Sequence, residues 1–186
     1  MKPLDMKDIA IIDAFPVYNC ERKVLNVGCG DGRIDFHLAI MGYRVHAFDS
    51  KPYDTWVDGK NLTFQKADIF EAQNLPSASI VICSQVLEHL KEWKRALPIL
   101  IGLTEIRLVI TIPYRKSFNG SGGVHCNFWD DRASGEFKDI HEFQTLCHPY
   151  AVSISKIRTK LKDAKTDKYD YLIIVDKRQD YTRGPQ

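Results

Sequence analysis

The stretch KVLNVGCGDG (residues 23–32) joins an apolar run to three glycines that are spaced two residues apart. The apolar run is typical of a short buried strand, and residues 31–42 have the periodicity of a helix. Gly28, Gly30 and Gly32 stand at the turn between them, where the missing Cβ permits positive φ and lets another group approach the backbone closely. The stretch therefore predicts a strand-turn-helix unit whose turn faces a ligand or a neighbouring helix.

The rest of the chain continues this rhythm. Apolar runs predict four further strands, followed by an antiparallel pair at the sheet edge; the six runs are residues 43–50, 62–70, 78–85, 106–113, 151–161 and 170–177. Residues 86–100 have helical spacing, with Val86, Leu90, Trp93 and Leu97 on one face. Residues 135–147 likewise have apolar positions at helical spacing. Strands separated by helical or irregular crossovers predict an α/β protein with a mostly parallel sheet.

Composition narrows the class of protein. The chain has 186 residues, of which 44% are hydrophobic and 27% charged, a balance typical of one globular domain. Its formal net charge of +2 is too small to predict a nucleic-acid-binding surface. Five scattered cysteines and the lack of a secretory leader favour a cytoplasmic location, and no apolar run is long enough to span a membrane.

The spacing of the glycines can be compared with that of two known phosphate-binding motifs. The dinucleotide fingerprint is G-x-G-x-x-G, whereas here Arg33 occupies the position of the third glycine. The phosphate-binding P-loop is excluded because no G-K-[ST] follows. An oxidoreductase that uses a nicotinamide dinucleotide is therefore the less favoured reading of this turn.

Polar residues follow the other predicted strands. Asp49 ends the second strand, where a carboxylate can accept two hydrogen bonds from a ribose diol, and Asp68 follows the third. Ser84 and Gln85 lie where the fourth strand passes into a helix. The carboxyl ends of parallel strands share one edge of an open α/β sheet, so these residues are expected to border one crevice.

In this order, "VLNVGCGDG", "AFDS", "ADIF" and "SQVLEHL" resemble the motifs of the class I S-adenosylmethionine-dependent methyltransferases. The resemblance covers about residues 23–113, and the terminal strand pair extends it to about residue 177. It implies a Rossmann-like, doubly wound, mostly parallel seven-stranded sheet with an antiparallel C-terminal β-hairpin. We expect an N-terminal helical segment (1–22), a methyltransferase domain (23–177) and a flexible tail (178–186).

The resemblance also implies a binding site for S-adenosylmethionine. The glycine turn would lie against the methionine part, Asp49 would bind the ribose and Ser50 would lie beside the adenine. Asp68 and Ile69 would bracket the adenine, with Ser84 and Gln85 at the methionine end. The implied cofactor-binding residues are Asn26, Gly28, Cys29, Gly30, Asp31, Gly32, Asp49, Ser50, Asp68, Ile69, Ser84 and Gln85. Asn26 departs from the family, which usually has Asp or Glu there, and so lacks the charge available to a cofactor ammonium.

Residues after the fifth strand are the candidates for catalysis. His125 is predicted as a general base, with Asp130 or Asp131 as a possible orienting partner and Tyr114 as its rival. Glu88 and His89 are expected to make local hydrogen bonds or to face solvent. No metal site is predicted, because His125, Cys126, Cys147 and His148 lack the spacing of zinc ligands.

The predicted activity is methyl transfer to an oxygen or nitrogen atom of a small-molecule acceptor. The fourth strand ends in "CSQV", unlike the N/D-P-P-Y/F of amino-methyltransferases that act on nucleic-acid bases, and the chain has no Pro-Cys nucleophile. Two alternatives stay open: a non-catalytic cofactor-binding module of the same fold, and an NAD-dependent oxidoreductase. The sequence identifies neither the acceptor nor the oligomeric state.

Overall fold

A computed structural model describes residues 3–16, 22–114, 125–132, 134–160 and 168–177. The predicted tail (178–186) and part of the N-terminal segment lie outside these residues. The helices, including the short 3₁₀ helices η1 and η2, are α1 (Met6–Asp13), α2 (Arg33–Ile40), η1 (Ile69–Asn74), η2 (Leu87–His89), α3 (Trp93–Leu103) and α4 (Glu142–Leu146). The strands are β1 (Lys23–Val27), β2 (Arg44–Asp49), β3 (Leu62–Lys66), β4 (Ala78–Ser84), β5 (Thr104–Pro113), β6 (Phe128–Asp130), β7 (Phe137–Asp139), β8 (Ala151–Lys160) and β9 (Lys168–Asp176).

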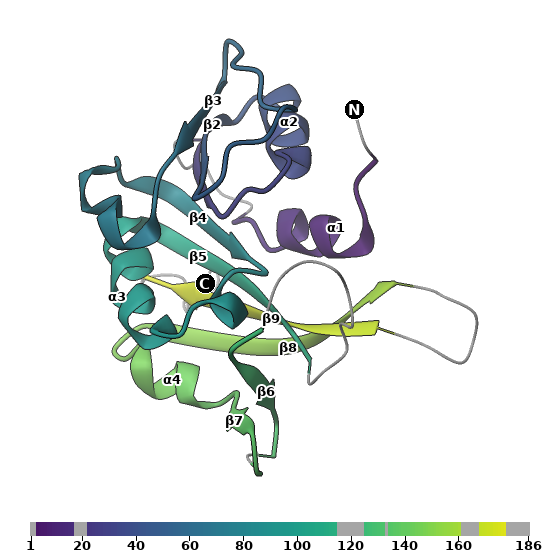
Figure 1. Ribbon diagram of the computed structural model, residues 1–186, viewed down its shortest axis with the longest axis vertical. Helices are drawn as coiled ribbons and strands as arrows, with labels where there is room; N and C mark the ends of the chain where they lie inside the picture. The colour runs from purple at the N-terminus through teal and green to yellow at the C-terminus, as the bar shows by residue number, and fades with distance from the viewer. Residues whose placement is uncertain (1–2, 17–21, 115–124, 133, 161–167, 178–186) are drawn as a thin grey trace, which may run out of the picture.

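The main sheet confirms the predicted fold class. Its seven strands have the order β3-β2-β1-β4-β5-β9-β8 (Figure 1). Neighbours among β1 to β5 are parallel, whereas β9 pairs antiparallel with both β5 and β8. From β1 the chain winds outward to β2 and β3, and then to β4 and β5 on the other side. The carboxyl ends of β1 and β4 thus flank the switch point at which open α/β sheets bind ligands.

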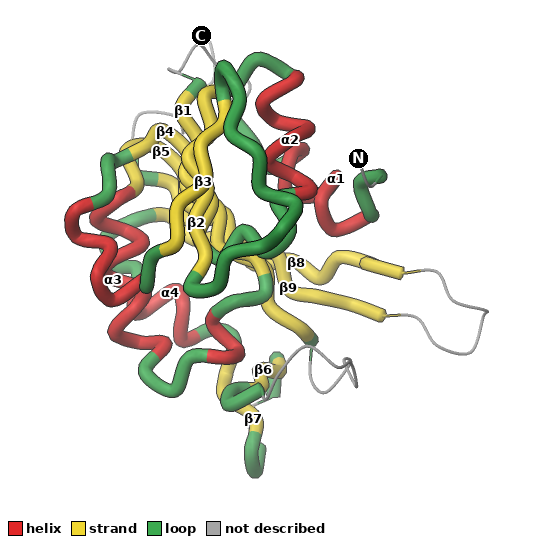
Figure 2. The backbone as a smooth tube through the Cα atoms, turned by 45° about the horizontal axis from the view of Figure 1, so that its top comes forward, coloured by secondary structure: helices red, strands yellow, loops and turns green. Residues whose placement is uncertain are grey.

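Helices cover both faces of this sheet, as Figure 2 shows with α1 and α2 on one side and α3 and α4 on the other. Successive strand residues point to opposite faces, so Val24 packs with the α1–α2 cluster and Leu25 with the α3–α4 cluster. Among the described residues, none of the helices has both the length and the apolar character that a membrane crossing requires.

The prediction of one helix over residues 86–100 is wrong. The structure has the short η2, an extended residue at Leu90 (φ −93°, ψ 115°), and then α3. Tertiary hydrogen bonds capture the carbonyls that a continuous helix would use: Asn127 Nδ2 donates to the carbonyl oxygens of Leu87 and Leu90 at 3.0 and 2.7 Å. Trp93 and Leu97 are buried in the core as predicted, whereas Val86 and Leu90 line a cavity.

Helical spacing over residues 135–147 also predicts too much helix. Only α4 is helical, and β7 pairs with β6 in a small parallel sheet. The N–H of Ile140 donates to the carbonyl oxygen of Asp130 at 2.9 Å, which extends this pairing. The helix consequently begins later in the chain than predicted. Ile140 and Phe143 are nonetheless buried in the core.

The third strand is shorter than predicted. It ends at Lys66, and Asp68 Oδ1 accepts a hydrogen bond from the N–H of Phe70 at 2.8 Å, which turns the chain into η1. This turn holds Asp68 and Ile69 at the carboxyl end of β3, where the sequence placed them.

Candidate functional site

A cavity of about 600 Å³ opens at the carboxyl ends of β1, β2 and β4. This volume is in the range of small-molecule and cofactor sites, about 300–1,000 Å³. Every predicted cofactor-binding residue except Gly32 lines it: Asn26, Gly28, Cys29, Gly30, Asp31, Asp49, Ser50, Asp68, Ile69, Ser84 and Gln85. The fold therefore brings together residues that lie far apart in the sequence.

The glycine turn is shaped by positive φ and close packing. Gly28 has φ +72°, and a Cβ built on it would overlap Cγ2 of Val86. Gly32, with φ +77°, caps the start of α2, and a Cβ there would lie 2.6 Å from Phe64 Cζ. Gly32 thus packs against an aromatic ring, while Gly28 shapes the cavity wall.

Asp49 is fastened to the glycine turn. One carboxylate oxygen accepts a hydrogen bond from the N–H of Gly30 at 3.0 Å, and the other accepts from the N–H of Lys51 at 3.1 Å. The side chain of Asp49 is half-buried at the end of β2 and lines the cavity. Ser50 Oγ also donates to Asp49 Oδ1, at 3.4 Å. A carboxylate has about four acceptor positions, so these three bonds leave capacity for a ligand hydroxyl.

Gln85 adopts an unusual backbone conformation at the end of β4. Its φ is +58°, which for a residue other than glycine costs on the order of 1–3 kcal/mol and is common at functional sites. Its side-chain Nε2 donates to Asp170 Oδ2 at 3.2 Å, and burial raises the pKa of Asp170 to about 6. The neighbouring Ser84 Oγ shares a hydrogen bond of 2.8 Å with Thr111 Oγ1. These contacts fix two cavity residues in place.

Behind the glycine turn lies a buried carboxyl group that the sequence did not reveal. Asn26 Nδ2 donates to both carboxylate oxygens of Asp35, at 2.9 and 3.0 Å, and the Asp35 side chain is fully buried. Desolvation raises the pKa of Asp35 to about 7, opposed by the hydrogen bond from Asn26. The Oδ1 atom of Asn26 is buried without a hydrogen-bond partner among the described residues, and Asn26 lines the cavity. The buried pair therefore offers an acceptor to a ligand.

The N-terminal helix closes one side of the cavity. Lys7, Asp8 and Ile11 of α1 line it. Arg33 of α2 pairs with Asp5 and with Asp8, each at 2.8 Å, and so ties α1 to the glycine turn. The sequence indicated a helix here but gave no signal that it contributes to the site.

The two predicted catalytic residues lie apart from the cavity lining. The His125 ring packs edge-on against His89, with centroids 4.7 Å apart, and His89 lines the cavity. Burial lowers the pKa of His125, as does the neighbouring His89. Tyr114 instead packs against Tyr171, with Lys156 Nζ 4.1 Å from its ring centroid.

The possible partners of His125 also have other contacts. Asp131 pairs with Lys156 at 3.1 Å, and Asp130 Oδ1 accepts from the N–H of Asp131 at 2.8 Å. Two of the four residues considered as zinc ligands differ in their burial: Cys147 is buried in the α3–α4 core, whereas His148 is exposed. Sequence reasoning placed Glu88 at the surface or in local hydrogen bonds, yet its side chain is 1% exposed.

Comparison with known proteins finds similarity to methyltransferases over part of the chain. Residues 25–100 match the model of the methyltransferase domain family. Ubiquinone biosynthesis O-methyltransferase of Rickettsia prowazekii is 32% identical over 74 residues, which are 36% of this chain and 29% of that protein. The chain thus aligns with less than a third of the length of this relative.

Solved structures share the fold across most of the chain. Magnesium protoporphyrin IX methyltransferase from Synechocystis PCC 6803, crystallised with S-adenosylmethionine, has a TM-score of 0.60 at 18% identity; 91% of this chain and 76% of that one are covered. The N-methyltransferase NodS from Bradyrhizobium japonicum, in complex with S-adenosylhomocysteine, has a TM-score of 0.62 at 13% identity, with coverage of 92% and 86%. At these identities the likeness establishes the fold.

Proposed function

We propose that this protein transfers a methyl group from S-adenosylmethionine to a small-molecule acceptor, because residues 25–100 match the methyltransferase domain model and the fold is that of solved methyltransferases. The observation that carries the proposal is the cavity at the switch point, where the glycine turn, Asp49 and the β4 end converge. The acceptor atom is an oxygen or nitrogen. We place the protein in the cytoplasm, because its five cysteines are scattered along the chain rather than arranged as a disulfide framework.

The cavity residues fit the chemistry of this cofactor. Asp49 accepts hydrogen bonds from the ribose hydroxyls, with Ser50 and Ile69 beside the adenine. Asp68 accepts from the adenine amino group. At the other end, Asn26 Oδ1, which has no hydrogen-bond partner among the described residues, accepts from the methionine ammonium, and the Asp35 carboxyl group behind it holds the Asn26 amide in place. The backbone of Gly28 and Gly30 approaches the methionine part.

Methyl transfer is an in-line displacement, so the protein acts mainly by positioning donor and acceptor. Ser84 and Gln85 border the methionine end, so the acceptor enters on the side of His89 and His125. A hydroxyl or ammonium acceptor must also lose a proton, and neutral His125 is our candidate base because its lowered pKa keeps it unprotonated near neutral pH. Tyr114 is the alternative base.

The experiment is a transfer assay with S-adenosylmethionine labelled in its methyl group and pooled phenols, alcohols and amines. We expect label in one acceptor class. Cofactor binding without transfer to any acceptor would instead support a binding module of the same fold. Parallel His125→Gln and Tyr114→Phe variants assign the base, since loss of the true base lowers kcat with little change in cofactor affinity.

A further inference from the structure

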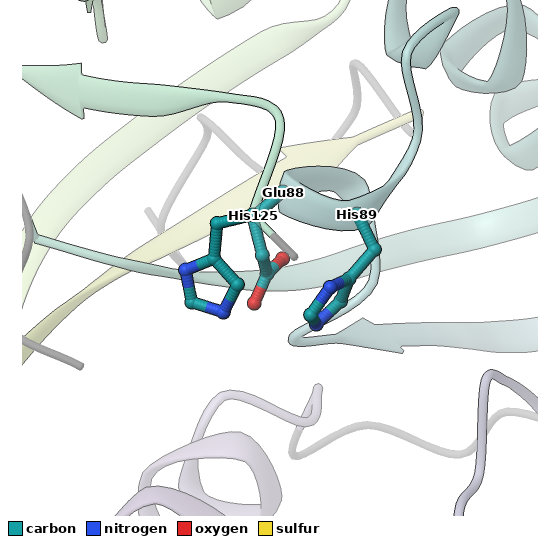
Figure 3. A group of neighbouring side chains, drawn as sticks. All are labelled: Glu88, His89 and His125. Carbon is teal, nitrogen blue, oxygen red and sulfur yellow. The ribbon is translucent and has the colours of Figure 1, made fainter. Parts of the chain in front are cut away.

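Three potential metal-ligating side chains meet beside the cavity. Glu88 and His89 belong to η2, and His125 lies just before β6. Their ligand atoms all lie within 4.8 Å of one another, and Figure 3 shows the Glu88 carboxylate between the two imidazole rings. Backbone hydrogen bonds hold the two segments together, because the N–H groups of Cys126 and Asn127 both donate to the carbonyl oxygen of Glu88. The cluster is therefore built by the fold.

Glu88 is the residue that needs an explanation. Both of its carboxylate oxygens are buried, and neither has a hydrogen-bond partner among the described residues. A buried ionised carboxylate without a partner costs several kcal/mol, and a protonated one would still leave its hydroxyl unsatisfied. The side chains nearest to these oxygens include two imidazoles, which offer lone pairs or protons. A bound cation would resolve the cost of burying Glu88.

The ligand set indicates the kind of cation. Two imidazoles and one carboxylate suit divalent transition metals such as Zn²⁺, Co²⁺ or Fe²⁺, whereas Mg²⁺ and Ca²⁺ prefer oxygen ligands. Bonds from the metal to nitrogen and oxygen ligands are about 2.0–2.2 Å long, so the three ligand atoms would have to move closer together than 4.8 Å when an ion binds. Three protein ligands would leave coordination positions for water or substrate.

We propose that Glu88, His89 and His125 bind one divalent transition-metal ion at the acceptor end of the cavity. Its catalytic role rests on the proposed methyl transfer, whereas metal binding stands on the cluster alone. His89 also lines the cavity, so the ion would lie within reach of an acceptor hydroxyl placed near Ser84 and Gln85. The favoured acceptor is consequently an alcohol or phenol. With the ion bound, His125 is a ligand and no longer the base.

In this reaction, the ion coordinates the acceptor oxygen and lowers the pKa of its hydroxyl, whose proton passes to solvent. The oxygen lone pair then forms a bond to the methyl carbon. The carbon–sulfur bond breaks with its electron pair going to sulfur, so the products are the methyl ether and S-adenosylhomocysteine. No oxidant or reductant is needed.

Metal binding is tested directly with Co²⁺ alone. The full chain is stripped with a chelator and titrated with Co²⁺ while its visible absorption and the heat of binding are recorded. We expect one ion per chain, a ligand-field band, and displacement by Zn²⁺. Glu88→Gln keeps the shape of the side chain and should weaken binding at least 10-fold, as should His125→Gln. The matched control, His141→Gln, changes an exposed histidine and should bind as the wild type does.

Two results would overturn the proposal. One is the absence of stoichiometric Co²⁺ binding by folded wild type; the other is wild-type affinity in both Glu88→Gln and His125→Gln. Circular dichroism of each variant establishes that it is folded. If Glu88→Gln does not fold, His125→Gln alone provides the test. Titration of the metal-free protein with S-adenosylhomocysteine is separate: binding there upholds the proposed cofactor even if the metal site fails.

Discussion

At the scale of single residues, the carboxyl group that the family usually has at position 26 is found on a different element. Asn26 on β1 is neutral, but it donates both amide hydrogens to Asp35 on α2. Asp35 does not line the cavity, whereas Asn26 does, and the Asn26 amide oxygen has no hydrogen-bond partner among the described residues. The two residues should therefore depend on each other.

Asn26→Asp tests this dependence. The substitution replaces two donated hydrogen bonds by a second buried carboxyl group, and we expect the free energy of unfolding to fall by about 3 kcal/mol. Adding Asp35→Asn restores one donor and one acceptor in exchanged positions. The double variant should recover most of the loss, which a double-mutant cycle by urea denaturation measures. Additive effects would show that the pair is not coupled.

The sequence identified position 26 as unusual but not its partner. Asp35 lies in an amphipathic stretch, where an aspartate is ordinarily exposed, so nothing local distinguishes it from a surface residue. Its burial depends on how α2 packs against β1, which is a tertiary property. The same holds for Glu88, which is buried and whose carbonyl oxygen accepts hydrogen bonds from the distant N–H groups of Cys126 and Asn127.

At the scale of elements, the turn after β1 requires glycine for two different reasons. Gly28 needs both positive φ and the absence of a Cβ, because Val86 occupies that space. Gly30 has φ +56°, but a Cβ there would meet nothing within 4 Å. Gly30 is therefore required only by its backbone conformation, whereas Gly28 is required by its backbone conformation and by packing.

Gly28→Ala should lower stability more than Gly30→Ala. Both substitutions place alanine at positive φ, at a cost of about 1 kcal/mol, but only the first also overpacks against Val86, for a further 1–3 kcal/mol. Thermal denaturation measures the difference, and Val86→Ala combined with Gly28→Ala should recover part of it. Equal losses in the two single variants would contradict the packing role assigned to Gly28.

Local pattern predicted the strands better than the helices. The sequence predicts each of the seven strands of the main sheet in its place, although β3 ends four residues earlier than predicted. The predicted helix over residues 86–100 failed because Asn127, far along the chain, captures the carbonyl oxygens of Leu87 and Leu90. Such contacts are invisible in a window of neighbouring residues.

At the scale of the whole molecule, the buried Asp35 makes stability depend on pH. Its pKa is about 7 in the folded protein, mainly through desolvation, against about 3.9 in an unfolded chain. The folded state therefore binds the proton more tightly. The resulting stability is fully present below about pH 4 and is lost as the pH rises through 7.

Asp35→Asn removes this titration. Relative to the variant, the wild type should lose free energy of unfolding as the pH rises from 4 to 7, by at most about 1.4 kcal/mol per pH unit. Urea denaturation of both proteins at several pH values gives the difference curve, in which other titrating groups largely cancel. A flat difference curve would mean that Asp35 has an ordinary pKa.

The site as a whole was predictable only in part. The residues at the strand ends follow from the sheet topology, and all but Gly32 line one cavity. Two other parts of the site join segments that are distant in the sequence, and no motif spacing predicts that they meet. One is the contact of α1 with the glycine turn, made by Arg33 with Asp5 and Asp8. The other is the cluster of Glu88, His89 and His125.

We propose that the cavity at the switch point binds the S-adenosyl group, with Asp49 on the ribose. Calorimetric titration with S-adenosylhomocysteine should give one site per chain in the wild type. Asp49→Ala should lose on the order of 100-fold in affinity, because two charge-assisted hydrogen bonds are removed. Asp54→Asn, which neutralises an exposed aspartate nearby, should bind as the wild type does. No binding by the wild type, or equal affinity in Asp49→Ala, would contradict the claim.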